Sequence, residues 1–179
     1  PDDLVKAVIC THDLKEQDYI NSHYVVMATK KGVVKKTCLE QYSRPRQNGI
    51  VAITIKEDDE LLEVRLTSGN SQVMLAVKSG KAIRFPEEKV RAVGRSGSGV
   101  RGISFDDEAN DEVIGMITIE NPKEETVLVV SENGYGKRTF IDDPETGEAV
   151  YRITNRGGKG VKTISVTEKT GNLVAIKSV

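Results

Sequence analysis

Apolar residues in this chain occur in short runs that are interrupted by polar turns, and one arrangement of them occurs three times. Each copy has an apolar strand, a tight turn that ends in glycine, and a second strand with a basic residue four positions after that glycine. The copies span Tyr24–Lys36, Gln72–Arg84 and Thr126–Arg138. Short runs rich in Val and Ile, bounded by Gly, Asn or Asp, are typical of β-strands. The pattern therefore predicts a β-hairpin in each copy.

Each copy continues with two more strand signals in the same order. The middle signals begin at a glycine and span Gly49–Ile55, Gly102–Phe105 and Gly160–Val166, and the last signals span Leu61–Leu66, Val113–Ile119 and Leu173–Ile176. The turn glycines Gly32, Gly80 and Gly134 lie 48 and 54 residues apart, a period in the range of propeller-type repeats. We predict an all-β, propeller-like fold of about three four-stranded blades, without a convincing helix.

The repeat phase divides the chain into blades at residues 24–71, 72–125 and 126–179. Leu4–Ile9 matches the last strand of a unit, so residues 1–23 are predicted to be the last strand and linker of a preceding blade. Closed propellers have about four to eight blades, and we therefore expect an open arc. Its exposed blade edges could pair with another chain, which makes edge-to-edge self-association possible.

Charge alternates in step with the repeat, although the net charge is only −1. Residues 24–49 hold six Lys or Arg against one acidic residue, and residues 78–102 hold seven against two. Residues 103–133 reverse the balance, with one basic residue against nine acidic ones. In a radial array this alternation predicts a basic stripe beside a separate acidic zone, and a basic stripe is typical of a polyanion-binding surface. The alternative is that these cations only solvate outer strands.

The candidate DNA-binding residues are the repeated cations and the clusters that follow them in each copy. They are Lys35, Lys36, Arg44, Arg46, Lys81, Arg84, Arg91, Arg95, Arg101, Lys137, Arg138, Arg152, Arg156 and Lys159. Glycines interleave the later clusters at Gly97–Gly102 and Gly157–Gly160. Glycine lets backbone N–H groups approach a phosphate closely, although such glycines can equally serve bulges and bends.

The sequence also disfavours an enzymatic or a metal-binding function. Cys10 and Cys38 are isolated and the only histidines are His12 and His23, so the spacing of a metal site is missing. The glycines of Gly97–Gly102 match the dinucleotide fingerprint, but a short strand and an acidic turn follow where a helix should begin. We predict no catalytic residue, no metal and no cofactor. No long apolar run or leader sequence is recognisable, which predicts a cytoplasmic protein without membrane contact.

Together, several segments resemble the C-terminal domain of the DNA gyrase A protein. They are Val33–Thr37, Ser43–Gly49, Gly94–Ile103, Gly136–Arg138 and Thr154–Thr163, and the resemblance covers essentially the whole chain. One departure concerns the box Gln-Arg-Arg-Gly-Gly-Lys-Gly of that family. Only Thr154–Gly160 approaches it, with Thr and Asn in place of the first two residues.

The resemblance implies a β-pinwheel whose basic perimeter bends and wraps duplex DNA to support ATP-dependent negative supercoiling. It also implies two partners, which are the rest of gyrase A and the gyrase B protein, with strand-passage chemistry located elsewhere in the enzyme. The equivalent domain of topoisomerase IV and a protein-interaction propeller remain as alternatives. An interaction propeller would favour aromatic anchors, whereas this chain has no Trp and 4% aromatic residues.

Overall fold

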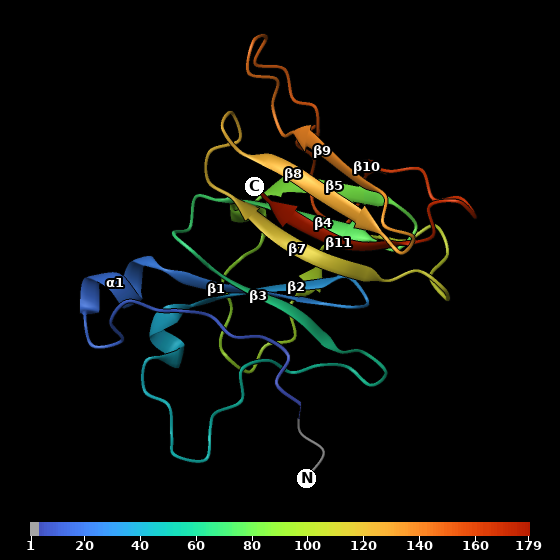
Figure 1. Ribbon diagram of the computed structural model, residues 1–179. Helices are drawn as coiled ribbons and strands as arrows, with labels where there is room; N and C mark the ends of the chain where they lie inside the picture. Colours follow the sequence, from blue (N-terminus) through green and yellow to red (C-terminus); the bar gives the residue numbers. More distant parts are fainter. Residues whose placement is uncertain (1–3) are drawn as a thin grey trace.

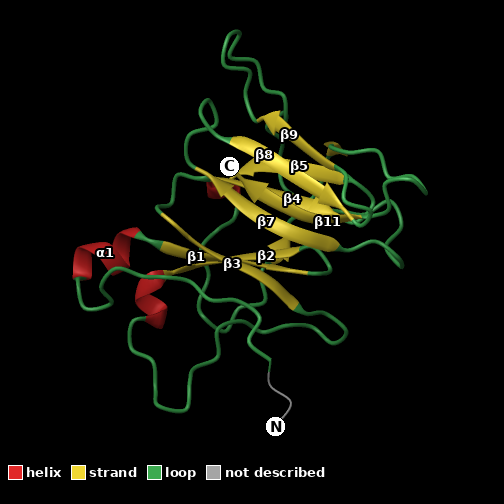
Figure 2. Ribbon diagram, viewed as in Figure 1, coloured by secondary structure: helices red, strands yellow, loops and turns green. Residues whose placement is uncertain are grey.

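The computed structural model describes residues 4–179 as a stack of small antiparallel sheets (Figure 1). The helical elements are α1 (Gln17–Ser22) and the 3-10 turns η1 (Leu39–Tyr42) and η2 (Glu87–Lys89). The strands are β1 (Tyr24–Thr29), β2 (Val33–Cys38), β3 (Leu61–Thr67), β4 (Gln72–Val77), β5 (Lys81–Pro86), β6 (Val100–Arg101), β7 (Val113–Ile119), β8 (Thr126–Ser131), β9 (Gly136–Phe140), β10 (Val161–Lys162) and β11 (Leu173–Ser178). Strands dominate and loops connect them (Figure 2), so the all-β prediction is confirmed.

Three sheets carry the repeat. The first sheet has the strand order β3-β1-β2-β6, the second sheet β10-β5-β4-β7, and the third sheet β11-β8-β9. Each predicted hairpin is present, as β1–β2, β4–β5 and β8–β9. The last strand of each unit pairs with the first strand of the same unit, as β3 does with β1. The first two sheets thus have the predicted four strands, whereas the third has three among the described residues.

The fourth strand of a sheet comes from the next unit along the chain. Strand β6, from the unit that begins at β4, pairs with β2 of the first sheet, and β10 pairs in the same way with β5 of the second sheet. The amide of Gly102 donates to the carbonyl of Gly32 at 2.7 Å, and the amide of Thr163 donates to the carbonyl of Gly80 at 2.8 Å. A sheet is therefore not identical with a sequence unit, and the unit boundaries 24–71, 72–125 and 126–179 stay a prediction.

Apolar side chains fill the spaces between successive sheets. Val26 and Val34 of the first sheet pack with Leu75 and Phe85 of the second sheet. A second cluster joins the second and third sheets in the same manner. Strands β3, β7 and β11 lie one above another along one side of the stack (Figure 1). The core is therefore divided between neighbouring sheets, as repeat architectures require.

The N-terminal residues cover the outer face of the first sheet and differ from expectation. Leu4–Ile9 forms no hydrogen-bonded strand, although Ala7 and Ile9 pack against this face. The six-residue helix α1 was not predicted, because one buried apolar residue, Ile20, gives no helical periodicity. No helix within residues 4–179 has the length and apolar character needed to cross a membrane.

The predicted middle strands are mostly wrong. Only Val100–Arg101 and Val161–Lys162 pair as strands, and residues 49–55 form none. The segments that contain β6 and β10 run along the edge of the preceding sheet for two residues. The first of them then turns into the interior, where Ile103 is 1% exposed. The alternating apolar residues thus reflect burial between sheets and not a long ladder.

The turn glycines offer a matched test of the packing between units. Gly80 has φ +90°, and a Cβ placed there would lie 2.5 Å from the carbonyl oxygen of Ile164 in the next unit. Gly134 has φ +80° at the same repeat position, but a Cβ there meets nothing within 4 Å. Gly134→Ala should cost about 1 kcal/mol for the left-handed backbone, and Gly80→Ala roughly 3 kcal/mol because overpacking is added. Urea unfolding of both variants measures the difference, and equal losses would contradict the cross-unit contact.

Candidate nucleic-acid interface

Two of the three repeated cations lie inside the protein. Lys36 on β2 is 6% exposed and Arg84 on β5 is 2% exposed. The Lys36 ammonium lies 3.1 Å from a carboxylate oxygen of Glu87, at the start of η2 in the next unit. The Arg84 guanidinium donates to Asp142 at 2.6 Å and to the carbonyl of Tyr151 at 2.8 Å, both in the following unit. Each cation therefore links its own sheet to the next unit.

Lys35 is also buried, at 1% exposed. Its ammonium donates to the carbonyl of Ala52 at 2.7 Å and to the carbonyl of Arg95. Desolvation first, and then the charge of Arg95, lower the pKa of Lys35 to about 8. The predicted DNA contacts of Lys35, Lys36 and Arg84 are accordingly corrected, because a buried cation whose donors are used inside the protein cannot reach a phosphate.

The third repeated cation has a different environment. Arg138 and its neighbour Lys137 on β9 are exposed, and neither has a side-chain ion pair or hydrogen bond within residues 4–179. The reason is topological, since β9 is the edge strand of the third sheet and the described chain places no further unit against it. Within residues 4–179, the same repeat position is thus buried where a following unit covers it and exposed where none does.

The basic loops that follow β2, β5 and β9 are exposed and lie next to one another. We call residues 43–49, 91–101 and 152–160 the Arg/Gly strip. Arg95 donates to the carbonyl of Val51 at 2.6 Å, and Thr54 donates its amide to the carbonyl of Gly97 at 3.2 Å. Arg156 reaches from the third loop to the carbonyls of Lys89 at 2.9 Å and Arg101 at 3.2 Å. These bonds join the segment just after the first loop to the second loop, and the third loop to the second unit, along the stack.

The strip contains both tethering arginines and free ones. Arg95 is half-buried and Arg156 is exposed, and the guanidinium groups of both donate hydrogen bonds to carbonyls of the preceding unit. The arginines that are exposed and have no side-chain partner within residues 4–179 are Arg44, Arg46, Arg91 and Arg152. Free guanidinium groups can bind phosphates at two oxygens each.

Acidic residues limit the strip on one side. Asp106 accepts ion pairs from Lys81 and from Lys159, the latter at 2.9 Å. Hydrogen bonds from Lys81 first, and then from Lys159, lower the pKa of Asp106 to about 2. Arg101 lies 3.7 Å from Glu108. Lys81, Lys159 and Arg101 are therefore partly neutralised at the border of the strip.

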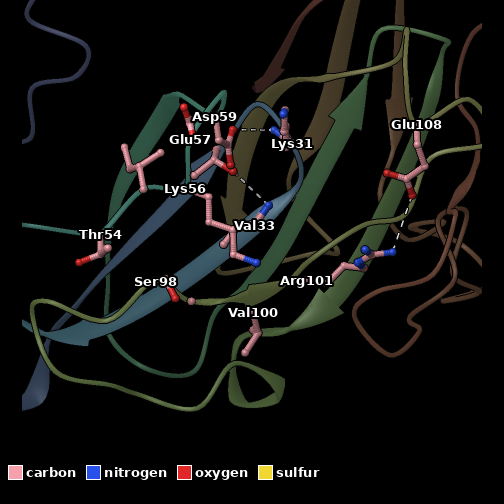
Figure 3. Close-up of a pocket in the computed structure, with 13 residues that line it drawn as sticks. Lys31, Val33, Thr54, Lys56, Glu57, Asp59, Ser98, Val100, Arg101 and Glu108 are labelled. Carbon is pink, nitrogen blue, oxygen red and sulfur yellow. Dashed lines mark hydrogen bonds and ion pairs between the residues drawn. The ribbon is translucent and has the colours of Figure 1, made fainter.

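A hollow of about 320 Å³ lies where the first two units meet (Figure 3). Figure 3 shows Arg101 and Glu108 paired on one side of it, and on the other side the backbone amide of Lys31 donating to Asp59. Its lining mixes basic and acidic groups in similar number, so it offers no net charge to an ionic ligand. Within residues 4–179, no group of three or more His, Cys, Asp or Glu side chains is placed to hold a metal ion.

The acidic partners of the buried cations were missed from the sequence, although a signal exists. Glu87 lies seven residues after the turn glycine Gly80, and Asp142 lies eight residues after Gly134. An acid seven or eight residues after the turn glycine of one unit, together with a cation four residues after the glycine of the previous unit, marks the ion pair.

Comparison with known proteins gives one consistent result. The family described as "DNA gyrase C-terminal domain, beta-propeller" matches residues 23–68, 72–120, 125–143 and 146–179. The DNA gyrase A protein of Staphylococcus aureus (strain MRSA252) is 43% identical over 178 residues, which are 99% of this chain and 19% of that protein. The chain thus spans about a fifth of the length of the curated relatives it matches.

Solved structures share the fold. The C-terminal domain of DNA topoisomerase IV superposes with a TM-score of 0.78 at 24% identity, covering 92% of this chain and 48% of that chain. The DNA gyrase A C-terminal domain superposes with a TM-score of 0.71 at 23% identity, covering 89% of this chain and 50% of that chain. At these identities the superpositions establish the architecture alone, which is the predicted β-pinwheel.

Arg84 and Arg138 form a matched pair, because the same repeat position is buried in one unit and exposed in another. Arg84→Met leaves Asp142 without its partner and should destabilise the protein by about 3 kcal/mol. Arg138→Met should change the free energy of unfolding by less than about 0.5 kcal/mol. Chemical denaturation compares the two, and similar losses would show that the Arg84 ion pair has no special structural role.

Lys35 should give stability a characteristic pH dependence. Because burial lowers its pKa from 10.5 to about 8, the unfolded chain binds more protons than the folded protein between these values. Stability contributed by this site therefore rises with pH across that window. The neutral amine still has two hydrogens for its two carbonyl partners. Urea unfolding at both ends of the window should show a smaller rise for Lys35→Met than for the unmodified chain, and an identical rise would contradict the assignment.

Proposed function

Because the chain belongs to the DNA gyrase A C-terminal domain family, we propose that it binds duplex DNA along the Arg/Gly strip and bends it around the stacked sheets. The observation that carries this proposal is that Arg95 and Arg156 join the second and third loops to the preceding units, at Val51 just after the first loop and at Arg101 of the second loop. Contiguous basic loops on a curved array can follow a DNA backbone, whereas isolated cations cannot.

The mechanism is neutralisation of phosphates on one side of the duplex. Arg44, Arg46, Arg91 and Arg152 supply free guanidinium groups, and Lys137 with Arg138 extend the basic surface onto β9. Each phosphate contact releases counterions, so affinity depends steeply on salt and little on base identity. Bending tens of base pairs costs about 1–6 kcal/mol, which several such contacts can offset.

The tethering residues have a different task. Arg95 and Arg156 bind carbonyls of the preceding unit, and Lys36 with Arg84 fix one unit to the next through buried ion pairs. A fixed angle between units determines the curvature that the DNA must follow. In this proposal the buried cations shape the interface, and the free cations bind to the phosphates.

The wider assignment follows from the family. The chain serves as a DNA-wrapping part of gyrase A, which works with gyrase B in the cytoplasm, and the cleavage and ATP-driven steps lie in other domains. Topoisomerase IV is the second candidate, supported by its structural likeness, but the 43% identity over 99% of this chain is to gyrase A. An interaction propeller is less well supported, since 4% of the residues are aromatic and aromatic anchors dominate interaction hot spots.

The salt dependence of DNA binding tests the proposed strip. Arg44→Ala with Arg46→Ala removes two free cations and should reduce the slope of log K against log salt by about 1.8, or 0.9 per contact. The control removes two exposed lysines outside the strip, Lys123→Ala with Lys177→Ala, and should leave the slope within error. Filter binding of a random-sequence duplex at several salt concentrations gives both slopes. An unchanged slope in the arginine variant would overturn the proposed interface.

A further inference from the structure

We propose that Lys35 strengthens the binding of duplex DNA from beneath the Arg/Gly strip, without contact to a phosphate. Its buried ammonium holds two neighbouring segments together, and no carboxylate of the described chain forms an ion pair with it. A duplex that lies on the strip brings negative charge close to this ammonium. The role assigned to Lys35 rests on the function proposed above and adds a buried residue to that binding site.

The Lys35 ammonium joins the first unit to the second directly below the strip. It donates to the carbonyl of Ala52, just after the first loop, at 2.7 Å, and to the carbonyl of Arg95 in the second loop. The Tyr42 hydroxyl donates to the same Ala52 carbonyl at 2.8 Å. Because Arg95 itself belongs to the strip, the ammonium lies one residue layer below the surface that a duplex would contact.

The fold does not require a cation at this position. The third residue after the turn glycine is Lys35 in the first unit and Ile83 in the second, and the two residues are 1% and 2% exposed. The carbonyl of Gly102, at the repeat position of Ala52, accepts instead from the amide of Gly157 in the third loop, at 2.7 Å. An apolar residue and a backbone bond therefore support a basic loop in the second unit, where the first unit uses a buried amine.

The Lys35 charge is not balanced inside the protein, unlike that of its neighbour. Lys36, on the same strand, is paired with Glu87. Within residues 4–179, no carboxylate lies within ion-pair distance of Lys35, and the titratable groups that face it are Arg95 of the second loop and Tyr42 of η1. A buried charge without a counterion costs free energy, so the approach of a polyanion from outside favours the charged form.

Uptake of protons is the measurable consequence of this arrangement. Burial, and then the charge of Arg95, lower the pKa of Lys35 to about 8. A bound polyanion raises this pKa again, so binding takes up protons near that pH, and affinity falls as the pH rises through that range. Burial raises the pKa of the Tyr42 hydroxyl, which therefore stays neutral there. The neutral amine still has two hydrogens for its two carbonyls, so the pH-dependent part of the affinity reflects the charge and not the bridge.

Lys35 should affect the salt dependence of binding less than a residue that contacts a phosphate. Loss of one phosphate contact lowers the slope of log K against log salt by about 0.9. Interactions of a buried charge are screened much less by salt, so loss of Lys35 should lower the affinity with a clearly smaller change of slope. If binding raises the pKa of Lys35 by about one unit, the protonated chain binds roughly tenfold more tightly than the neutral one.

Calorimetry of the 179-residue chain with a random-sequence duplex, in two buffers of different ionisation enthalpy near the pKa of about 8, measures the proton uptake. The unmodified chain should take up a fraction of a proton, and its affinity should fall several-fold as the pH rises through this pKa. Lys35→Ile copies the residue of the second unit and should bind roughly tenfold more weakly below that pKa, take up fewer protons and have a flatter pH profile. The control Lys123→Ala removes an exposed lysine outside the strip and should behave like the unmodified chain.

Thermal unfolding checks that each variant is folded, and Lys35→Met, with a straight side chain, replaces Lys35→Ile if the branched residue impairs folding. An unmodified chain that binds DNA without proton uptake, or a variant with an unchanged pH profile, overturns the role of Lys35 and leaves the proposed strip intact. A slope lowered by the full value of about 0.9 in the variant also overturns it, since Lys35 would then contact a phosphate. A chain that binds no duplex overturns the proposed function and this role together.

Discussion

The structure depends on one hydrogen-bonded constraint, which is that the second and third units each send a short strand back to the sheet of the unit before them. Strands β6 and β10 close the edges of β2 and β5, and the amides of Gly102 and Thr163 bond the turn glycines of the preceding unit. Because the loop that carries each short strand also carries the Arg and Gly residues, the same constraint aligns the basic loops.

That constraint divides the basic residues into two classes. Cations beneath the exchanged strand lose water and must be paired, as Lys36 is with Glu87 and Arg84 with Asp142. The free arginines of the Arg/Gly strip remain exposed and are available to a polyanion. Burial of a paired cation seldom adds stability over an apolar residue of similar size, so we interpret these ion pairs as fixing the register of one unit on the next. The curvature proposed for DNA follows from that register.

The sequence predicted the parts of the fold that are local. The hairpins β1–β2, β4–β5 and β8–β9 appear where alternation and the turn glycines placed them, because strand pairing across a tight turn needs only neighbouring residues. The exchange between units could not be predicted, since Val100 pairs with Val34 across 66 residues. For the same reason, the positions of the basic residues in the repeat could be predicted, but their burial or exposure could not. A basic repeat position such as Arg84 looks identical to Arg138 in sequence, and only the stacking of the next unit buries one of them.

Amide hydrogen exchange resolved by residue tests the strand exchange most directly. The amides of Gly102 and Thr163, which donate across units, should exchange as slowly as the central amides of β4, because opening either bond requires separation of two sheets. The amide of Ala52, at the equivalent place in the first unit, should exchange quickly. Rapid exchange at Gly102 and Thr163 would contradict the account, since the units would then be joined by the chain alone.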